Sequence, residues 1–190
     1  MSIEPRSLTY TVPGMEEKAS AAVIEILQDR LHALNDLALT LKHVHWNVVG
    51  PHFIAVHTML DPQVESVRAM VDAVAERIAT LGGSPIGTPG ALVAERTWDD
   101  YAVGRDDAIS HLGALDLVYT GVVGDHRAGI GRTESLDPVT QDMLIAQSAE
   151  LEQFQWFVRA HLENSDGTLR SAGATTEKAA AGQVSASSAR

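Results

Sequence analysis

The chain has 190 residues, of which 45% are hydrophobic, and it carries a formal net charge of −11 at pH 7. It contains no cysteine, which excludes disulfides, thiolate zinc sites and cysteine nucleophiles and is typical of a reducing cytoplasm. The acidic balance argues against a generally basic nucleic-acid-binding surface and suits a protein that attracts cations, although it also suits a surface that only aids solubility.

The length is sufficient for one domain with a full hydrophobic core. No apolar run reaches the ~18–20 residues that cross a bilayer. Residues 1–14 lack the basic and apolar regions of a signal peptide. We therefore expect a cytoplasmic protein with no membrane partner.

Residues 1–15 are predicted to form an irregular N-terminal tail, and the first helix covers residues 16–48. Apolar residues recur there at alternating steps of four and three, which marks one buried stripe. The next step of four in this stripe reaches His45. Gly50–Pro51 ends the helix.

The second predicted helix covers residues 51–81, with an apolar stripe that runs from Phe53 to Leu81 and ends at Gly82–Gly83. Pro62 lies inside this pattern. A proline there removes a backbone donor and clashes with the preceding turn, so it predicts a kink, or a restart of the helix with Asp61 as the N-cap.

The remaining chain predicts two more long helices. Residues 84–103 form a long connection in which ALVAER forms a short helix, and the third long helix covers residues 105–130. Asp137 followed by Pro138 is a good start for the fourth helix, which continues to residue 163. We expect an all-α four-helix bundle as one domain over residues 16–164, and a disordered C-terminal tail of mostly small residues over residues 165–190.

Histidines and carboxylates gather unusually densely between residues 43 and 76. On the second helix, at about 100° per residue, Asp61, Asp72 and Glu76 fall about 40°, 60° and 100° from His57. They form a polar stripe beside the apolar one. His57 and Asp61 are one turn apart, as are Asp72 and Glu76, so each pair could hold one ion. Asp61 and Asp72, however, are separated by ~16 Å at 1.5 Å per residue, which no single metal ion can bridge.

Two interpretations follow from this separation. Either each pair serves a different end of the chain, or the pairs meet across a dimer. The residue numbers favour the dimer, because 57 plus 76 and 61 plus 72 both equal 133. An antiparallel packing of this helix on its own copy, with the two-fold axis near residues 66–67, brings each pair opposite the other and creates two equivalent sites. Glu65 would then face Arg68 of the second copy.

His45 reaches the same region from the end of the first helix. Two imidazoles and three carboxylates, without sulfur, suit iron, manganese or zinc, and carboxylates stabilise the higher charge of Fe(III). Taken singly, the histidines are explained as core or interface residues, Asp72 and Glu76 as a solvated face, and Asp61 as an N-cap. It is the joint spacing that favours a metal site.

The sequence also resembles a known family. The run HWNVVGPHFIAVHTMLD, followed by Asp72, the AER of residues 75–77 and LGGSP, is similar to the signature of the Dps family, ferritin-like mini-ferritins named for DNA protection in starved cells. The resemblance covers roughly residues 16–163 and includes QFQWFVRAHLE near the end of the last predicted helix.

The resemblance implies a hollow homododecamer of four-helix subunits, built from two-fold dimers. It implies a ferroxidase centre in which His45, His57 and Asp61 of one subunit meet Asp72 and Glu76 of its mate, with iron as the metal and room for two ions per site. Fe(II) would be oxidised to Fe(III) by hydrogen peroxide or dioxygen, with peroxide preferred in many members. The ferric mineral would be stored in the cavity, which protects against oxidative stress.

Trp46 and His43 flank His45 in the sequence. The resemblance places Trp46 beside the centre as an accessory residue that donates electrons or traps radicals, while packing at the helix end explains it as well. His43 lies two positions before His45 and points elsewhere, so we expect a surface or interface histidine.

The resemblance also implies acidic pores at the three-fold axes, near the start of the fourth helix, where Asp137 and Asp142 lie. Asp137 is equally explained as an N-cap.

DNA binding is where the sequence departs from the family name. Family members that bind DNA usually use lysine-rich tails, but residues 165–190 hold only three basic residues against two acidic ones, and the N-terminal tail before Glu16 holds Arg6 and Glu4. DNA binding through the C-terminal tail, close to the nucleoid, would therefore be weak and lost with modest salt, although twelve copies add avidity. A nucleoid-associated DNA-protecting protein is the alternative function.

Overall fold

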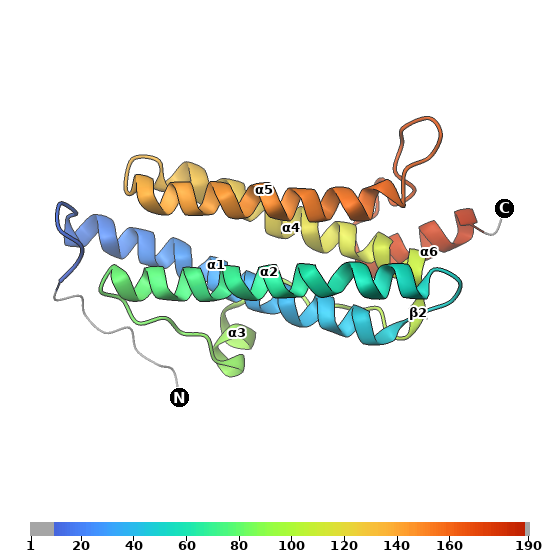
Figure 1. The fold of residues 1–190 in the computed structure, drawn as a ribbon, viewed down its shortest axis with the longest axis horizontal. Coiled ribbons are helices and arrows are strands. Elements are labelled where there is room, and N and C mark those ends of the chain that lie inside the picture. The colour runs from blue at the N-terminus through green and yellow to red at the C-terminus, as the bar shows by residue number, and fades with distance from the viewer. Residues whose placement is uncertain (1–9, 189–190) are drawn as a thin grey trace.

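The computed structural model describes residues 10–188. Four long helices form a bundle: α1 (Glu17–Asn47), α2 (Phe53–Thr80), α4 (Ala108–Thr133) and α5 (Pro138–Ala160). Helices α1 and α2 form one layer and α4 and α5 the other, with the short helix α3 (Pro89–Glu95) outside the first layer (Figure 1). The predicted four-helix bundle with a short helix in the long connection is confirmed.

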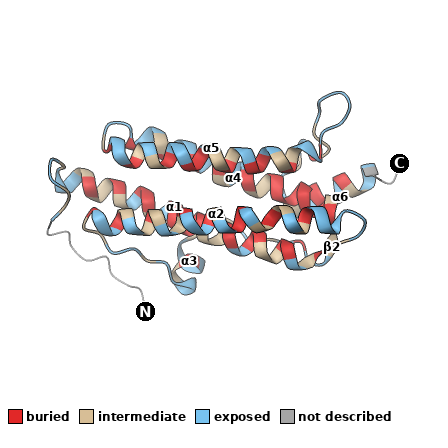
Figure 2. Cartoon of the chain, in the orientation of Figure 1, coloured by how far each residue is buried: buried red, intermediate tan, exposed pale blue. Residues whose placement is uncertain are grey.

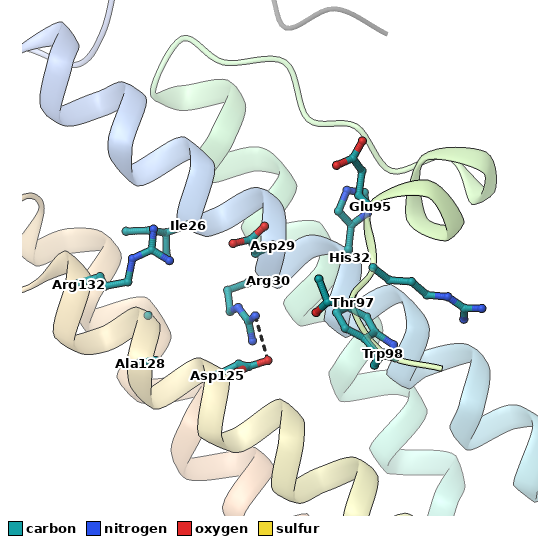
Figure 3. Close-up of a pocket in the computed structure, with 12 residues that line it drawn as sticks. Ile26, Asp29, Arg30, His32, Glu95, Thr97, Trp98, Asp125, Ala128 and Arg132 are labelled. Carbon is teal, nitrogen blue, oxygen red and sulfur yellow. Dashed lines mark hydrogen bonds and ion pairs between the residues drawn. The ribbon is translucent and has the colours of Figure 1, made fainter. Parts of the chain in front are cut away.

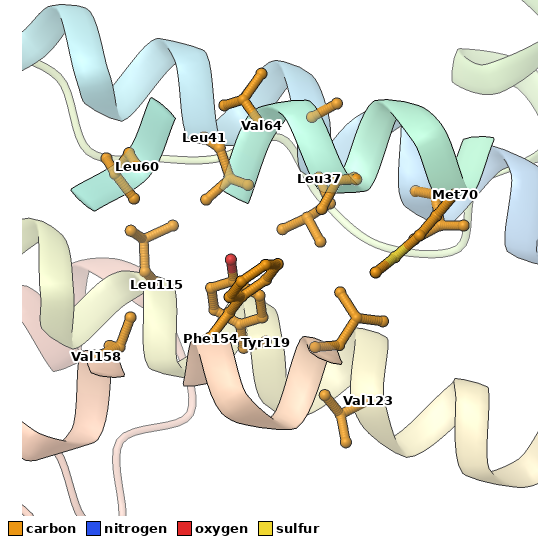
Figure 4. Packing of buried hydrophobic residues seen from close by; sticks show 14 of the residues in the cluster. Leu37, Leu41, Leu60, Val64, Met70, Leu115, Tyr119, Val123, Phe154 and Val158 are labelled. Atoms are coloured by element: carbon orange, nitrogen blue, oxygen red, sulfur yellow. The ribbon is translucent and has the colours of Figure 1, made fainter. Parts of the chain in front are cut away.

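The core lies between the two layers, because each long helix turns its apolar stripe inward (Figure 2). Figure 4 shows Leu41 of α1 and Leu60 of α2 facing Leu115 of α4 and Val158 of α5, all fully buried. Tyr119 lies at the centre of this core, where its hydroxyl donates a hydrogen bond to Gln63 Oε1 at 2.7 Å. The buried phenol therefore has the partner that it requires.

Helix α2 continues through Pro62, so the predicted restart with Asp61 as N-cap is wrong. The apolar stripe continues on both sides of the proline, with Leu60 and Val64 buried. The Pro62 side chain itself is exposed, so the carbonyl left without a backbone donor lies on the outer side of the helix. Packing of the stripe holds the helix together despite the local cost of the proline.

Two short strands that the sequence did not predict join the ends of distant helices. Strand β1 (Val48–Val49) pairs in parallel with β2 (Asp106–Asp107), with Val48 opposite Asp106. Asp107 also caps α4, because its carboxylate accepts hydrogen bonds from the backbone N–H groups of Ile109 and Ser110. The turn between α1 and α2 is thereby fixed to the start of α4.

The C-terminal segment is not disordered as predicted, because α6 (Glu177–Ser188) packs against α4 near β2 (Figure 1). Ala180, Ala181 and Val184 are buried, and a Cβ atom on Gly113 of α4 would come within 2.9 Å of Val184. Small residues on both helices allow this close approach. The composition suggested disorder because residues 165–190 contain few bulky apolar side chains. The close contact between α6 and α4, however, requires small side chains.

The predicted N-terminal tail lies largely outside the described residues, which begin at Tyr10. Within residues 10–188, no helix is long and apolar enough to cross a membrane.

Candidate metal centre

The end of α1 and the first half of α2 bring three predicted ligands together. One potential ligand atom from each of His45, His57 and Asp61 lies within 4.8 Å of the others. The imidazole rings of His45 and His57 stack with their centroids 3.6 Å apart. The tight turn that allows this passes through Gly50, whose φ of 90° favours glycine. These three side chains form a candidate metal-binding group.

The orientation of His57 is fixed by the backbone of α1. His57 Nδ1 lies 2.9 Å from the carbonyl oxygen of His45, and only a protonated Nδ1 can donate to a carbonyl. The neutral ring therefore carries its proton on Nδ1 and leaves the Nε2 lone pair free. A backbone acceptor that holds the other ring nitrogen is the usual arrangement of a metal-ligating histidine.

His45 is buried, with 8% of its surface exposed, and neither ring nitrogen has a hydrogen-bond partner. Its Nε2 approaches Asp61 Oδ1 to 2.9 Å without the alignment of a hydrogen bond. A buried polar atom without a partner is costly. A metal ion between the imidazoles and the carboxylate would satisfy it, so the residues present fit a cation.

Lys42 is a neighbour of this group that the sequence analysis missed. Its Nζ lies 3.0 Å from Asp61 Oδ1. The hydrogen bond from Lys42 lowers the pKa of Asp61; partial burial opposes this, and the contact with His45 adds to it. Asp61 is therefore ionised at neutral pH and ready to bind a cation. The signal in the sequence was the spacing, because Lys42 lies one turn before His45 on the same face of α1.

Asp72 and Glu76 do not join this group within one chain. Both are exposed on α2, and eleven residues of rise place Asp72 ~16 Å beyond Asp61 along the helix. Neither carboxylate makes a hydrogen bond or an ion pair within residues 10–188. The structure thus brings three of the five predicted ligands together. The other two, Asp72 and Glu76, are free on the same side of α2.

Several large apolar side chains are exposed on α1, α2 and α3. Leu39, Trp46, Ile54 and Val93 are all exposed, Trp46 by 72%. A groove of about 600 Å³ runs between α1, α2 and α3, and Leu39, Arg68 and Val93 are among the residues that line it. Leu39 and Val93 therefore place exposed apolar surface in a groove, which suits an interaction site.

Three other predicted residues have distinct surroundings. His43 points away from the metal group, since its Nε2 lies 2.9 Å from the Val103 carbonyl oxygen and its ring contacts Tyr101. Asp137 is buried and caps α5 by accepting from the N–H of Val139. Asp142 is exposed on the same helix.

Asp137 is also paired with a cation. Arg77 Nη2 lies 2.7 Å from its carboxylate, and Thr140 donates a further short hydrogen bond. Burial raises the pKa of Asp137, but the hydrogen bonds from Arg77 and Thr140 outweigh it and hold the pKa below its usual range. Asp137 therefore has a structural role in this fold.

Comparison with known proteins identifies the family of the chain. The chain matches the family described as Ferritin-like domain over residues 24–167. The DNA protection during starvation protein of Mycolicibacterium smegmatis is 61% identical over 173 residues, which cover 91% of this chain and 94% of the relative.

Solved structures give the same result. DpsA14 from Streptomyces coelicolor is 66% identical, with a TM-score of 0.85 over 87% of this chain and 99% of its own. Mycobacterium smegmatis Dps is 61% identical, with a TM-score of 0.87 over 89% of this chain and 97% of its own. Dps from Microbacterium arborescens, solved in the high iron form, is 28% identical, with a TM-score of 0.74 over 81% of this chain and 99% of its own. The chain therefore belongs to the Dps family of ferritin-like proteins.

Proposed function

We propose that this protein oxidises Fe(II) to Fe(III) at sites shared between two subunits and stores the ferric product inside a hollow dodecamer. The observation that supports this most strongly is the half-assembled ligand set. His45, His57 and Asp61 are already within 4.8 Å of one another, whereas Asp72 and Glu76 lie free on the same face of α2. Iron is the substrate and the cargo of this reaction.

A two-fold dimer completes the site in this proposal. Helix α2 packs antiparallel on its copy about an axis near residues 66–67, so that Asp72 and Glu76 of one subunit face Asp61 and His57 of the other. The exposed apolar surface around α1 and α3 supplies a contact for such a dimer. Arg68, which lines the groove beside α2, would face Glu65 of the second copy.

The chemistry needs an oxidant, which we propose to be hydrogen peroxide, with dioxygen as the alternative. Two Fe(II) ions each lose one electron, and these electrons break the O–O bond of peroxide. Two protons complete two water molecules. Carboxylate ligands favour this direction because they stabilise Fe(III) over Fe(II). Since both electrons pass to one peroxide molecule, no hydroxyl radical is released.

Two further residues have proposed roles. The indole of Trp46 follows His45 directly and is exposed, which suits an accessory electron donor at the dimer interface. Asp142 is exposed at the start of α5 and suits an acidic pore through which Fe(II) enters. Asp137 beside it supports the pore by capping the helix, since its charge is balanced by Arg77.

The test is anaerobic loading with Fe(II), followed by peroxide, with ferric absorbance and particle size as the readouts. Wild-type protein should oxidise Fe(II) rapidly as a particle of several hundred kilodaltons. Asp72→Ala combined with Glu76→Ala should slow oxidation by about tenfold or more, because two carboxylate ligands are lost. Glu25→Ala, an exposed carboxylate on α1, is the control. An unchanged rate in the double variant would refute the site.

The names of the relatives favour DNA protection as a second function. Two basic residues of the C-terminal segment, Arg170 and Lys178, lie in a folded region of this chain. Arg170 donates to the carbonyl oxygens of Leu162 and His161, and α6, which carries Lys178, packs on α4. A salt-titrated gel shift with and without residues 165–190 is the test. Binding that depends on these residues and weakens with salt would establish this function.

A further inference from the structure

An apolar cavity lies between α1, α4, residues 98–102 and the start of α6. Its volume is about 510 Å³, which is within the range of cavities that hold small organic molecules. Its walls include aliphatic residues of α1 and α4 and two aromatic residues of the connection before α4: Leu37, Leu117, Val118, Val122, Trp98 and Tyr101. None of the candidate metal ligands lines it.

Most of these walls keep surface that a ligand can reach. Leu117, Val118 and Val122 are half-buried on the outer side of α4, and the rings of Trp98 and Tyr101 are half-buried as well. Apolar surface that water still touches gains free energy when an apolar group covers it. The cavity therefore suits a ligand with a hydrocarbon part.

Hydrogen bonds hold the two aromatic walls in place. Trp98 lies beside α1 (Figure 3), and its indole N–H donates to Asp36 Oδ2 at 2.7 Å. The Tyr101 hydroxyl is hydrogen-bonded to Nδ1 of His111, a buried residue of α4, at 2.9 Å. Walls that are fixed before a ligand arrives do not have to be ordered on binding, which favours affinity.

The charged groups around the apolar walls are mostly negative. The lining contains the ammonium group of Lys178 and five carboxylates: Asp36, Asp99, Asp100, Asp125 and Glu177. Burial raises the pKa of Glu177; the hydrogen bond from the backbone N–H of Ala102 opposes this, and the charges of Asp36, Asp99 and Asp100 add to the effect of burial. These carboxylates are therefore close enough to Glu177 to repel its charge, and a cation between them would relieve the repulsion.

Three of the five carboxylates already have a cationic partner. Arg96 lies 2.6 Å from Asp100 and 3.5 Å from Asp36. Arg30 lies 3.4 Å from Asp125. These three charges therefore contribute little to the attraction of a further cation.

The other two carboxylates, Asp99 and Glu177, make no ion pair within residues 10–188. Lys178 makes none either, although it lines the same cavity. The Glu177 carboxylate accepts a hydrogen bond from the N–H of Ala102 at 2.6 Å. This bond fixes the position of the carboxylate at the start of α6 and leaves its charge without a counter-ion.

We propose that this cavity binds a small organic ammonium ion, with its charge beside Asp99 and Glu177 and its hydrocarbon part against the apolar walls. The carboxylates favour a cation over an anion. The apolar walls favour an organic cation over a hydrated metal ion, and the rings of Trp98 and Tyr101 add attraction for a cation. The proposal does not depend on the iron function, because no candidate metal ligand lines the cavity.

The test is calorimetric titration of the assembled, iron-free protein at pH 7 with phenethylamine, hexylamine and phenethyl alcohol in turn. At least one of the two amines should bind saturably, at about one molecule per chain. Phenethyl alcohol has the same hydrocarbon part as phenethylamine without the charge, so it should bind about tenfold more weakly. Tighter binding of phenethylamine would assign the hydrocarbon part to the aromatic walls, and tighter binding of hexylamine to the aliphatic walls.

Variants separate the charge from the walls. Glu177→Gln keeps an acceptor for the Ala102 N–H and removes the charge, so it should weaken amine binding about tenfold and leave binding of the alcohol unchanged. Trp98→Leu removes part of the wall, so it should weaken binding of the amines and of the alcohol alike. Glu150→Gln is the matched control, since Glu150 is a half-buried carboxylate on α5 outside this lining.

Two results would overturn the proposal. One is the absence of saturable binding of both amines to the wild-type protein, which does not depend on how any variant folds. The other is amine binding that Glu177→Gln leaves unchanged. The peroxide-driven oxidation rate, measured on the same variants, should equal that of the wild type, so a failure of this proposal is distinguishable from a failure of the iron proposal.

Discussion

Asp137→Asn should destabilise the bundle because it removes one partner of a buried ion pair. The side chains of Asp137 and Arg77 are only 6% and 15% exposed, and the two lie 2.7 Å apart. Removing one partner of such a pair costs about 3–5 kcal/mol, since the other charge remains buried. Asparagine also caps helices, so the capping contribution is retained. Because Arg77 has some access to water, we expect the lower end, about 3 kcal/mol.

The assay is thermal unfolding at fixed protein concentration, since assembly makes the melting temperature concentration-dependent. A loss of about 3 kcal/mol in a domain of this size should lower the melting temperature by about 6–12 °C. Asp142→Asn, on the exposed face of the same helix, is the control and should change stability by less than about 0.5 kcal/mol. A variant at Asp137 that melts like the wild type would refute the structural role of the pair.

The dependence on pH provides a second check of the same pair. The pKa of Asp137 is lowered in the folded protein, because hydrogen bonds from Arg77 and Thr140 outweigh the effect of burial. The stabilisation is therefore present above the unfolded pKa of about 3.9 and is lost as the pH falls through the lower folded value. The difference in the free energy of unfolding between the wild type and Asp137→Asn should have its full size at pH 6 and should shrink below about pH 4.

Further predictions concern α6 and the neighbour of the metal group. Val184 is fully buried against Gly113, so Val184→Asp should undock α6 and allow proteolysis within residues 165–188, whereas Ser187→Asp on the exposed side should not. Lys42→Met removes a cation 3.0 Å from Asp61, so it should strengthen Co(II) binding by about 1 kcal/mol in a titration, whereas Lys18→Met should have no effect. Equal affinity in Lys42→Met and wild type would show that Lys42 does not compete for Asp61.

The long helices and the group of His45, His57 and Asp61 were predictable because they follow the helical periodicity of the sequence. Leu27 to Leu41 and Phe53 to Leu81 recur at helical spacing, and the same spacing placed His57 and Asp61 one turn apart. His45 was predictable because it continues the apolar stripe of the first helix. Lys42 could have been predicted in the same way, from its position one turn before His45.

The remaining features depend on contacts between distant segments, which periodicity does not report. The pairing of β1 with β2 joins residues far apart in sequence and involves only two residues on each side. Helix α6 is held by the fit of Val184 against Gly113. Continuity of α2 through Pro62 is decided by burial on both sides of the proline, which overrides the local preference of that residue.

If each iron site is shared between two subunits, mixing two inactive variants should restore part of the activity. One variant carries His57→Ala and Asp61→Ala, and the other carries Asp72→Ala and Glu76→Ala. In a mixed dimer, one site keeps all of its ligands and the other loses both pairs. Random pairing of equal amounts should therefore restore about one quarter of the wild-type sites.

The measurement is the rate of peroxide-driven Fe(II) oxidation after the two variants are unfolded together and refolded. The shared site predicts a rate of about one quarter of that of the wild type, with almost no oxidation by either variant refolded alone. A mixture that oxidises iron no faster than the average of the two separate variants would contradict the shared site.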